Sequence, residues 1–183
     1  MAQARAILGL EQDKTLFLLM SGSMGFGDVP EIASHLLALS GPDVRVLVLV
    51  GHNQRLKAEL AARFARDSRL IAVDFTTQVA VYMDACNITL TKPGGLTSTE
   101  AAVKNIPFVH TAPIPGCETV NARFFEALGI SLPTTTPLES AQAALLLAAD
   151  ESMRARLLAC QRREINPRAA DDIVDAISIL ADA

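Results

Sequence analysis

Aromatic residues are scarce in this sequence, and their scarcity excludes one class of partner. Only 4% of the 183 residues are aromatic, with no tryptophan and one tyrosine. Proteins that bind single-stranded nucleic acid stack its bases on aromatic side chains. The formal net charge of -4 also disfavours any partner held by bulk positive charge, whether nucleic acid or an anionic membrane surface. We therefore expect no nucleic-acid partner.

Cysteine and histidine are too few and too scattered to predict a metal site or a disulfide framework. The three cysteines show no C-x-x-C spacing, and the three histidines lie far apart in the sequence. No acidic D-x-D metal motif occurs. Reduced thiols in a cytosolic protein fit this pattern best. We expect neither a metal nor a cofactor.

Long apolar runs are also missing. No run approaches the roughly 20 residues that span a bilayer, and Met1–Ala6 lacks a signal-peptide pattern. We expect a cytoplasmic protein, and any action on lipid would take place from the membrane surface.

The sequence does contain the start of a nucleotide-binding fold, although the common nucleotide fingerprints are absent. The apolar run Thr15–Met20 leads into the glycine-rich turn Ser21–Asp28 and then into a helical pattern. The turn does not match G-x-G-x-x-G, and the second apolar run, Val44–Val50, ends in Gly51-His52-Asn53 without an acidic residue. NAD is therefore disfavoured, and the lack of Gly-Lys-Ser/Thr excludes a Walker P-loop.

Strand and helix patterns alternate along the rest of the chain. We expect residues 1–14 to form a linker or an N-terminal helix, and residues 15–183 to form one α/β domain. The alternation predicts a Rossmann-like, three-layer domain with a parallel sheet of about six strands. The expected strands are Thr15–Met20, Val44–Val50, Leu70–Val73, Ile88–Thr91, Pro107–His110 and Gly129–Ser131.

Helical periodicity predicts several helices and, for some of them, the apolar face. A helix is expected over Gln54–Ala65, and a terminal helix with one apolar side is expected over Ala169–Ala183. The helix expected over Glu118–Leu128 has apolar residues at the spacing of one helical face, and we expect them to be buried: Val120, Phe124 and Leu128.

The stretch Ile88–Ala102 is the strongest candidate for a binding site. It is a short apolar strand that breaks at Pro93-Gly94-Gly95 and restarts as a helix, whose first N–H groups and dipole suit an anion. Thr97 adds a hydroxyl donor, and Glu100 is placed to accept hydrogen bonds from the diol of a ribose. The same Thr97-x-x-Glu100 spacing is also a capping box, in which both side chains serve the helix itself. Local chemistry leaves both interpretations open.

These motifs resemble a known family. Thr91-Lys92-Pro93-Gly94-Gly95-Leu96-Thr97, Glu100-Ala101 and Pro115-Gly116-x-Glu118-x-x-Asn121 look like the donor-binding half of processive diacylglycerol glycosyltransferases and monogalactosyldiacylglycerol synthases. The resemblance runs from about Thr15 to Leu128. It implies one half of a GT-B fold, and it implies binding of a UDP-sugar as substrate.

The resemblance also implies positions for the parts of the ligand. The loop with Gly22, Ser23 and Met24 would face the cleft between two domains, although a tight turn without a ligand would look the same in sequence. The loop with Phe75 and Thr76 would receive uracil, whereas a buried Phe75 is the alternative. The glycine turn and the helix after it would hold the diphosphate and the ribose through Gly94, Gly95, Leu96, Thr97 and Glu100.

Two further positions are implied on the following helix. Glu118 would hold sugar hydroxyls, and Asn121 would support the loop that precedes the helix, Ala112–Gly116. A helix-capping role for Glu118 is the alternative. Cys117 stands where the family usually has glutamine, so the sugar preference stays open. Histidine likewise replaces the family's lysine or arginine at position 52, where a solvated turn is the expected role.

The implied activity is transfer of a hexose from a UDP-sugar to a lipid acceptor such as diacylglycerol. The acceptor and the catalytic base would belong to an N-terminal domain or subunit, so we expect no catalytic residue in this chain, and we expect the full-length enzyme to be peripheral at the membrane. The contribution of this half would be stabilisation of the departing UDP. The alternatives are a separate nucleotide-sugar-binding subunit of a split transferase, a regulatory module, and a relative of the UDP-N-acetylglucosamine epimerases.

Overall fold

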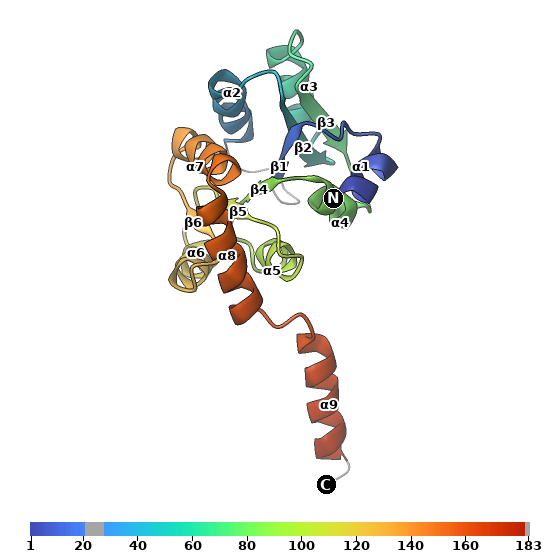
Figure 1. The fold of residues 1–183 in the computed structure, drawn as a ribbon, viewed down its shortest axis with the longest axis vertical. Helices are drawn as coiled ribbons and strands as arrows, with labels where there is room; N and C mark the ends of the chain where they lie inside the picture. Colours follow the sequence, from blue (N-terminus) through green and yellow to red (C-terminus); the bar gives the residue numbers. More distant parts are fainter. Residues whose placement is uncertain (21–27, 182–183) are drawn as a thin grey trace.

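Six parallel strands form one sheet in the computed structural model, which describes residues 1–20 and 28–181 (Figure 1). The order across the sheet is β3-β2-β1-β4-β5-β6. The strands are β1 (Thr15–Met20), β2 (Val44–Gly51), β3 (Leu70–Asp74), β4 (Ile88–Thr91), β5 (Phe108–His110) and β6 (Leu132–Pro133). The predicted Rossmann-like α/β fold with a parallel sheet is confirmed.

Helices connect the strands and cover both faces of the sheet. Their bounds are α1 (Ala2–Leu8), α2 (Val29–Leu39), α3 (Gln54–Arg63), α4 (Val79–Ala85), α5 (Gly95–Val103), α6 (Cys117–Ala127), α7 (Pro137–Ala149), α8 (Glu151–Glu164) and α9 (Ala169–Ala181). Helices α2 and α7 lie on one side of the sheet, and α1, α4 and α5 lie on the other (Figure 1).

The unbroken apolar strands are explained by burial on both faces. In β1, Phe17 and Leu19 pack in the cluster under α2, α3 and α7, whereas Leu16 and Leu18 pack in the cluster that includes Met83 of α4. Successive side chains of a strand point to opposite faces, so a central strand of a covered sheet must be apolar at every position. Burial at these four positions of β1 is essentially complete.

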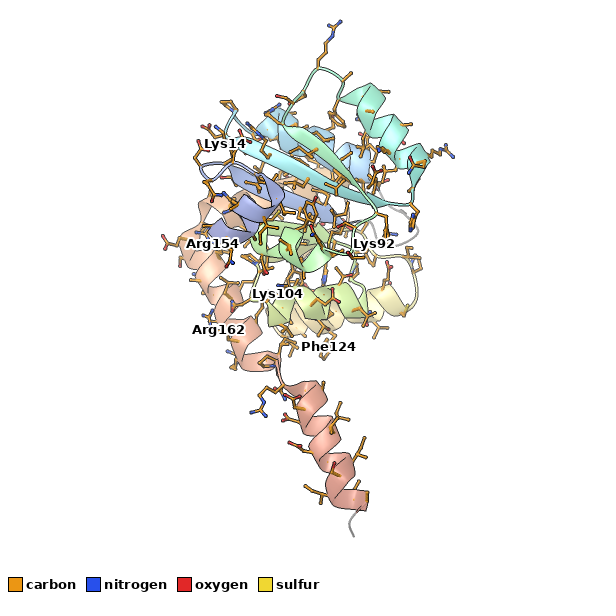
Figure 2. The ribbon with its side chains drawn as sticks, turned by 90° about the vertical axis from the view of Figure 1, so that its right-hand side faces the viewer. Lys14, Lys92, Lys104, Phe124, Arg154 and Arg162 are labelled. Carbon is orange, nitrogen blue, oxygen red and sulfur yellow. The ribbon has the colours of Figure 1, made fainter. Side chains whose placement is uncertain are left out.

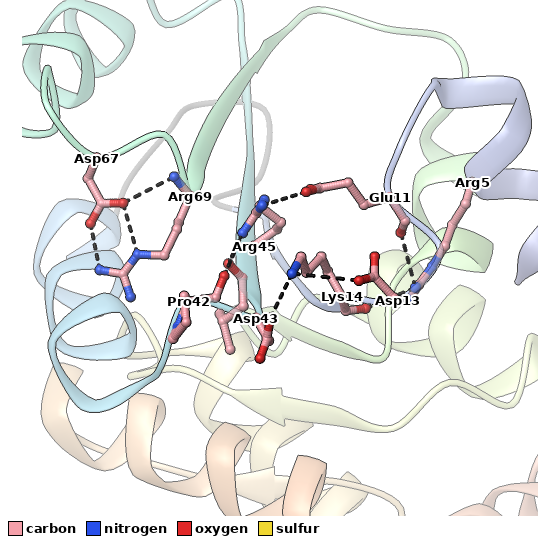
Figure 3. A network of polar contacts seen from close by, with 10 residues as sticks. Arg5, Glu11, Asp13, Lys14, Pro42, Asp43, Arg45, Asp67 and Arg69 are labelled. Carbon is pink, nitrogen blue, oxygen red and sulfur yellow. Dashed lines mark hydrogen bonds and ion pairs between the residues drawn. The ribbon is translucent and has the colours of Figure 1, made fainter.

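Charged side chains connect the loops at the amino-terminal edge of the sheet (Figure 3). Lys14 Nζ lies 2.6 Å from Asp43 Oδ1, and Arg69 Nη2 lies 2.6 Å from Asp67 Oδ2. Lys14 and Lys92 lie at opposite edges of the sheet (Figure 2).

Arg5 holds α1 against the domain. Arg5 is 3% exposed, and its guanidinium donates to oxygen acceptors of the described residues, among them the carbonyls of Ala85, Gln12 and Lys14 at 2.8–2.9 Å and Asn87 Oδ1 at 2.8 Å. Five such bonds satisfy a buried charge without a carboxylate partner. The first residues therefore form a helix that packs on α4.

The end of α6 differs from the predicted pattern. Residues 129–131 are not a strand, and β6 begins at Leu132, three residues after the predicted start. Gly129 adopts a φ of 68°, and its N–H bonds to Glu126 O while Ile130 N bonds to Phe125 O. This left-handed turn closes the helix and buries Ile130 beneath it.

The predicted buried face of α6 was wrong for Val120 and Phe124, whereas Leu128 is partly buried against the cluster of Phe108 and Phe125. Val120 is 66% exposed and Phe124 is 55% exposed, whereas Ala122 and Phe125 are buried. Phe125 packs edge-on to Phe108 of β5, which sets the rotation of the helix. Residues at spacings of three and four fit either of two neighbouring faces, and only contact with the sheet selects between them.

Helix α9 extends away from the rest of the domain (Figure 1). Its apolar residues are exposed, including Ile173 and Ile177 at 60% and Leu180 at 77%. The predicted apolar side is present, and nothing in the described part of the chain covers it.

Candidate functional site

The predicted site residues follow strands that end at the carboxyl edge of the sheet. Strand β1 pairs with β2 on one side and with β4 on the other. Strands β1 to β3 are added in one direction across the sheet and β4 to β6 in the opposite direction, so the strand order reverses between β1 and β4. Ligands of such sheets bind in the crevice at this switch point. Gly22, Ser23 and Met24 follow β1 and lie outside the described residues.

The glycine turn after β4 forms an open helix start. Gly94 is the N-cap of α5, with φ -77° and ψ 141°, and a Cβ placed on it would meet nothing within 4 Å. A Cβ on Gly95 would come no closer than 4.0 Å to Asn121 Nδ2. No side chain caps α5 in the described structure. The N–H groups of its first turn are therefore free of side-chain acceptors and open to an anion.

The capping-box interpretation of Thr97 and Glu100 is wrong. The helix begins at Gly95, so Thr97 is already its third residue and Glu100 its sixth, too far in to serve the first N–H groups as a box. A capping box would need Thr97 as the N-cap, three residues after the observed N-cap Gly94. The Glu100 side chain is exposed and makes no hydrogen bond or ion pair within the described residues.

Leu96 is the most exposed residue of this turn. Its side chain is 83% exposed, while Thr97 beside it is half-buried. A leucine on an open helix start adjacent to polar donors offers an apolar contact to a ligand or to a partner domain.

Two rings stack at the ends of β2 and β3. The centroids of His52 and Phe75 lie 4.3 Å apart with an interplanar angle of 13°. Phe75 is 59% exposed, so the alternative of a buried Phe75 is wrong. His52 is exposed, as expected for a solvated turn, but its stacking on Phe75 was not predicted. Together the rings form a flat surface of the kind on which a base stacks.

Thr76 completes the loop after β3. Its Oγ1 accepts a hydrogen bond of 3.0 Å from Gln78 N, just before α4. An ion pair of 2.6 Å between Lys57 Nζ and Asp74 Oδ2 lies beside the stacked rings. These contacts fix the loop on which Phe75 stands.

Glu118 and Asn121 project from the first turns of α6. Glu118 Oε2 accepts a hydrogen bond of 2.7 Å from Ile114 N in the preceding loop, not from the helix's own N–H groups. Asn121 Nδ2 donates to Pro93 O at 3.0 Å and so ties α6 to the glycine turn. Through these two side chains α6 is bonded to the loop after β4 and to the loop after β5. The bond from Asn121 to Pro93 was not predicted, because the two residues lie far apart in the sequence.

A cavity of about 180 Å³ opens at the same edge of the sheet. Its lining joins the ends of β4 and β5 to the starts of α2 and α7: Asp28, Ile32, Lys92, Thr111, Ala112, Ile114, Thr136, Pro137 and Ser140. A larger cavity, of about 490 Å³, lies at the opposite edge, and neither cavity is lined by any of the predicted site residues that the structure describes. The walls of the larger cavity come from strand starts, where ligands of parallel sheets rarely bind, so the smaller cavity is the relevant one.

A buried polar pair lies beneath α5. Ser98 Oγ lies 2.8 Å from His110 Nε2, and both residues are fully buried. Burial lowers the pKa of His110 to about 4, so the ring is neutral at physiological pH. Sequence analysis missed this pair, because nothing in the pattern connects a serine on a helix with a histidine twelve residues later.

Two further properties bear on chemistry and location. Within residues 1–20 and 28–181, no three histidine, cysteine or acidic side chains come together as metal ligands. Across the same residues, no helix has the length and apolar character needed to span a bilayer.

No protein-family model matches the chain, but individual relatives do. It is 26% identical over 148 residues to a processive diacylglycerol beta-glucosyltransferase of Staphylococcus carnosus, covering 81% of this chain and 38% of that protein. It is 30% identical over 132 residues to the enzyme of the same name from Staphylococcus aureus, covering 72% of this chain and 34% of that protein. The chain thus spans about a third of the length of these relatives.

Solved structures share the fold at low sequence identity. The structure of Staphylococcus aureus MnaA with UDP superposes with a TM-score of 0.74 at 16% identity, over 93% of this chain and 47% of that one. Acinetobacter baumannii MurG superposes with a TM-score of 0.72 at 19% identity, over 96% of this chain and 52% of that one. The fold described here therefore corresponds to about half of each of these proteins.

Proposed function

We infer that this chain, whose sequence and fold resemble the C-terminal, donor-binding domain of GT-B glycosyltransferases of the processive diacylglycerol glucosyltransferase type, binds a UDP-sugar. We further propose that it serves transfer of a hexose to a lipid acceptor such as diacylglycerol. The named activity of the two staphylococcal relatives supports this proposal. Since the chain spans only about a third of their length, the acceptor site and the catalytic base are assigned to an N-terminal domain or subunit.

The uncapped start of α5 is the observation that carries the proposal. An exposed Gly-Gly turn, free of side-chain caps in the described structure, offers several backbone donors to a diphosphate. A side-chain cap is present at the starts of α3, α7 and α8, from Asn53, Thr136 and Asp150. In the described structure α1, α2, α4 and α6 also start without a side-chain cap, so α5 is distinguished by the missing cap together with its open glycine turn at the carboxyl edge of the sheet. The absence of a cap is explained if the ligand supplies the acceptor.

The remaining parts of a UDP-sugar fit the neighbouring residues. We assign the base to the loop with Phe75 and Thr76, where the His52–Phe75 stack offers a flat apolar face. Glu100, exposed on α5 and without a described partner, is assigned to the ribose diol. Gly94, Gly95, Leu96 and Thr97 are assigned to the diphosphate.

The sugar is assigned to the region of Glu118 and of the loop that contains Gly22, Ser23 and Met24. Glu118 already accepts one bond from Ile114 N, and its second carboxylate oxygen remains for a hydroxyl group. Asn121 is assigned no ligand contact of its own, and it supports the glycine turn by donating a hydrogen bond to Pro93 O.

The chemistry proposed for this half is stabilisation of the leaving group. As the bond from the sugar to UDP breaks, negative charge grows on the diphosphate, and donors already aimed at it lower the barrier. The helix dipole adds to the donors of the first turn. We propose that the full-length enzyme works in the cytoplasm, at the membrane surface where its lipid acceptor resides.

A stand-alone nucleotide-sugar-binding subunit is the second candidate. The match of the whole fold to only about half of each solved neighbour favours a chain that needs a partner. Both candidates require the same UDP site, so they differ only in whether the partner is joined covalently.

Calorimetry with UDP, ADP and NAD tests the UDP site directly. We expect selective binding of UDP, in roughly the high micromolar to millimolar range for a half-site that no second domain closes. Equal affinities for the three ligands, or a preference for NAD, would contradict the proposal.

A further inference from the structure

The Ser98–His110 pair joins the candidate anion site to the sheet. Ser98 lies in the first turn of α5, and its N–H bonds to Gly94 O at 3.2 Å, which is the bond that begins the helix. Its Oγ lies 2.8 Å from His110 Nε2. His110 is the last residue of β5, so one hydrogen bond connects the end of a strand with the turn that presents free N–H groups.

His110 is held rigidly on the strand side of this bond. It is aligned with Thr91 in the ladder between β4 and β5, and its carbonyl accepts bonds from Thr134 N at 2.9 Å and from Thr134 Oγ1 at 2.8 Å. The ring lies edge-on to Phe125, with centroids 5.3 Å apart, and tilted on Phe108 at 5.1 Å. Because the His110 ring is held by these contacts, it can hold Ser98 Oγ at a defined position.

Stability alone does not account for the pair. His110 Nδ1 is buried with no partner in the described structure, so the ring is only half satisfied. Burying a half-satisfied imidazole and a hydroxyl is no more favourable than burying two apolar side chains of similar volume. A hydrogen bond differs from such apolar packing in being directional, and it fixes how far α5 lies from β5 and how it is rotated.

We propose that His110 is a positioning residue, which through Ser98 holds the first turn of α5 at the end of β5 and so keeps the open N–H groups of that turn aimed at the anion. The bond from Asn121 Nδ2 to Pro93 O holds the same turn from the side of α6. The effect on UDP rests on the proposed function, whereas the positioning of the helix does not.

Three variants of the pair and one control test the proposal. His110→Leu and Ser98→Ala each remove one side of the bond, and the double variant removes both. Ile130→Val is the matched control, because Ile130 belongs to the neighbouring apolar cluster and is not one of the rings that hold His110. UDP affinity is measured by calorimetry at a temperature where circular dichroism shows every variant folded. Amide hydrogen exchange at Ser98 is measured without ligand.

The hydrogen bond is expected to act on the turn and on the ligand together. Each single variant should lower UDP affinity and speed Ser98 exchange by about fivefold to tenfold, as expected for one buried hydrogen bond. The double variant should be no weaker than the weaker single variant, because the two groups act as one. Ile130→Val should lower the melting temperature while leaving UDP affinity unchanged, because it removes one buried methyl group away from the hydrogen bond.

Several outcomes would overturn the proposal. Unchanged Ser98 exchange in His110→Leu, additive losses in the double variant, or an equal loss of affinity in Ile130→Val would each reduce the pair to ordinary core packing. If His110→Leu does not fold, Ser98→Ala carries the same comparison. If the wild-type chain binds no UDP, the proposed function fails, and exchange at Ser98 still decides whether the pair positions the helix.

Discussion

Replacing Glu100 with glutamine is expected to weaken UDP binding while leaving the fold unchanged. Glu100 is exposed, lies six residues into α5 and has no side-chain partner in the described structure, so its carboxylate has no bond to lose on substitution. Glutamine has nearly the same shape and similar helix propensity. Any loss of affinity would therefore report on the ligand.

The magnitude follows from the change in the acceptor. A hydrogen bond to a charged group is worth about 1.5–3 kcal/mol and one to a neutral group about 0.5–1.5 kcal/mol, so a glutamine that still accepts from the ribose loses about 1–1.5 kcal/mol. That corresponds to roughly a fivefold to tenfold rise in the Kd for UDP. The loss of a negative charge near the N-terminus of α5 costs at most a few tenths of a kcal/mol in stability.

Calorimetry with UDP and with pyrophosphate, which has neither uracil nor ribose, separates the ribose contact from the diphosphate contact. The Glu100→Gln variant should bind UDP more weakly and bind pyrophosphate as the wild type does, because only UDP has the ribose. Glu126→Gln, an exposed glutamate on α6, is the matched control and should change neither affinity. A lower melting temperature with unchanged UDP affinity would refute the assignment of Glu100 to the ribose.

Three other predictions concern the base platform, the buried histidine and the activity of the chain. Phe75→Ala should raise the Kd for UDP by about tenfold with little loss of stability, since base stacking is worth about 1–3 kcal/mol and Phe75 is 59% exposed; titration and thermal melting measure the two effects, and unchanged affinity would remove the base from this loop. The pKa of His110 is lowered to about 4, so its contribution to stability is complete above the unfolded value near 6.5 and is lost as pH falls toward 4, by about 3 kcal/mol in all. Denaturant unfolding between these pH values should show the free energy of unfolding falling as the pH falls in the wild type and not in His110→Leu. If the free energies of both proteins fall in parallel, other groups are responsible. The isolated chain should form no glycolipid from labelled UDP-glucose, UDP-galactose or UDP-N-acetylglucosamine and diacylglycerol in detergent, because general-base help alone contributes about 10²–10⁴-fold; robust product from this chain would mean that it holds a base we have not identified.

The sequence determined the class of fold and the order of its elements. Apolar runs such as Thr15–Met20 and Val44–Val50 are strands in the structure because a sheet covered on both faces tolerates few other residues there. The glycine turn before α5 was also recognisable, since Pro93-Gly94-Gly95 cannot continue a strand or belong to a helix interior. These signals are local, and local sterics and hydropathy suffice to read them.

Tertiary contacts decided the details on which the candidate site depends. Helical periodicity left the rotation of α6 open by one residue, and packing of Phe125 against Phe108 settled it. The same holds for the start of α5, where a capping box and an open turn are both consistent with the letters, and only the structure shows the helix beginning at Gly95.

Contacts between distant segments were beyond the sequence altogether. His52 stacks on Phe75 across two strand ends, Asn121 reaches back to Pro93, and Ser98 meets His110 beneath the helix. Each pair forms because parallel strands bring their carboxyl ends to one edge, whatever the length of chain between them. A sequence specifies which residues are available at that edge, and the packing of the sheet and its helices determines which of them touch.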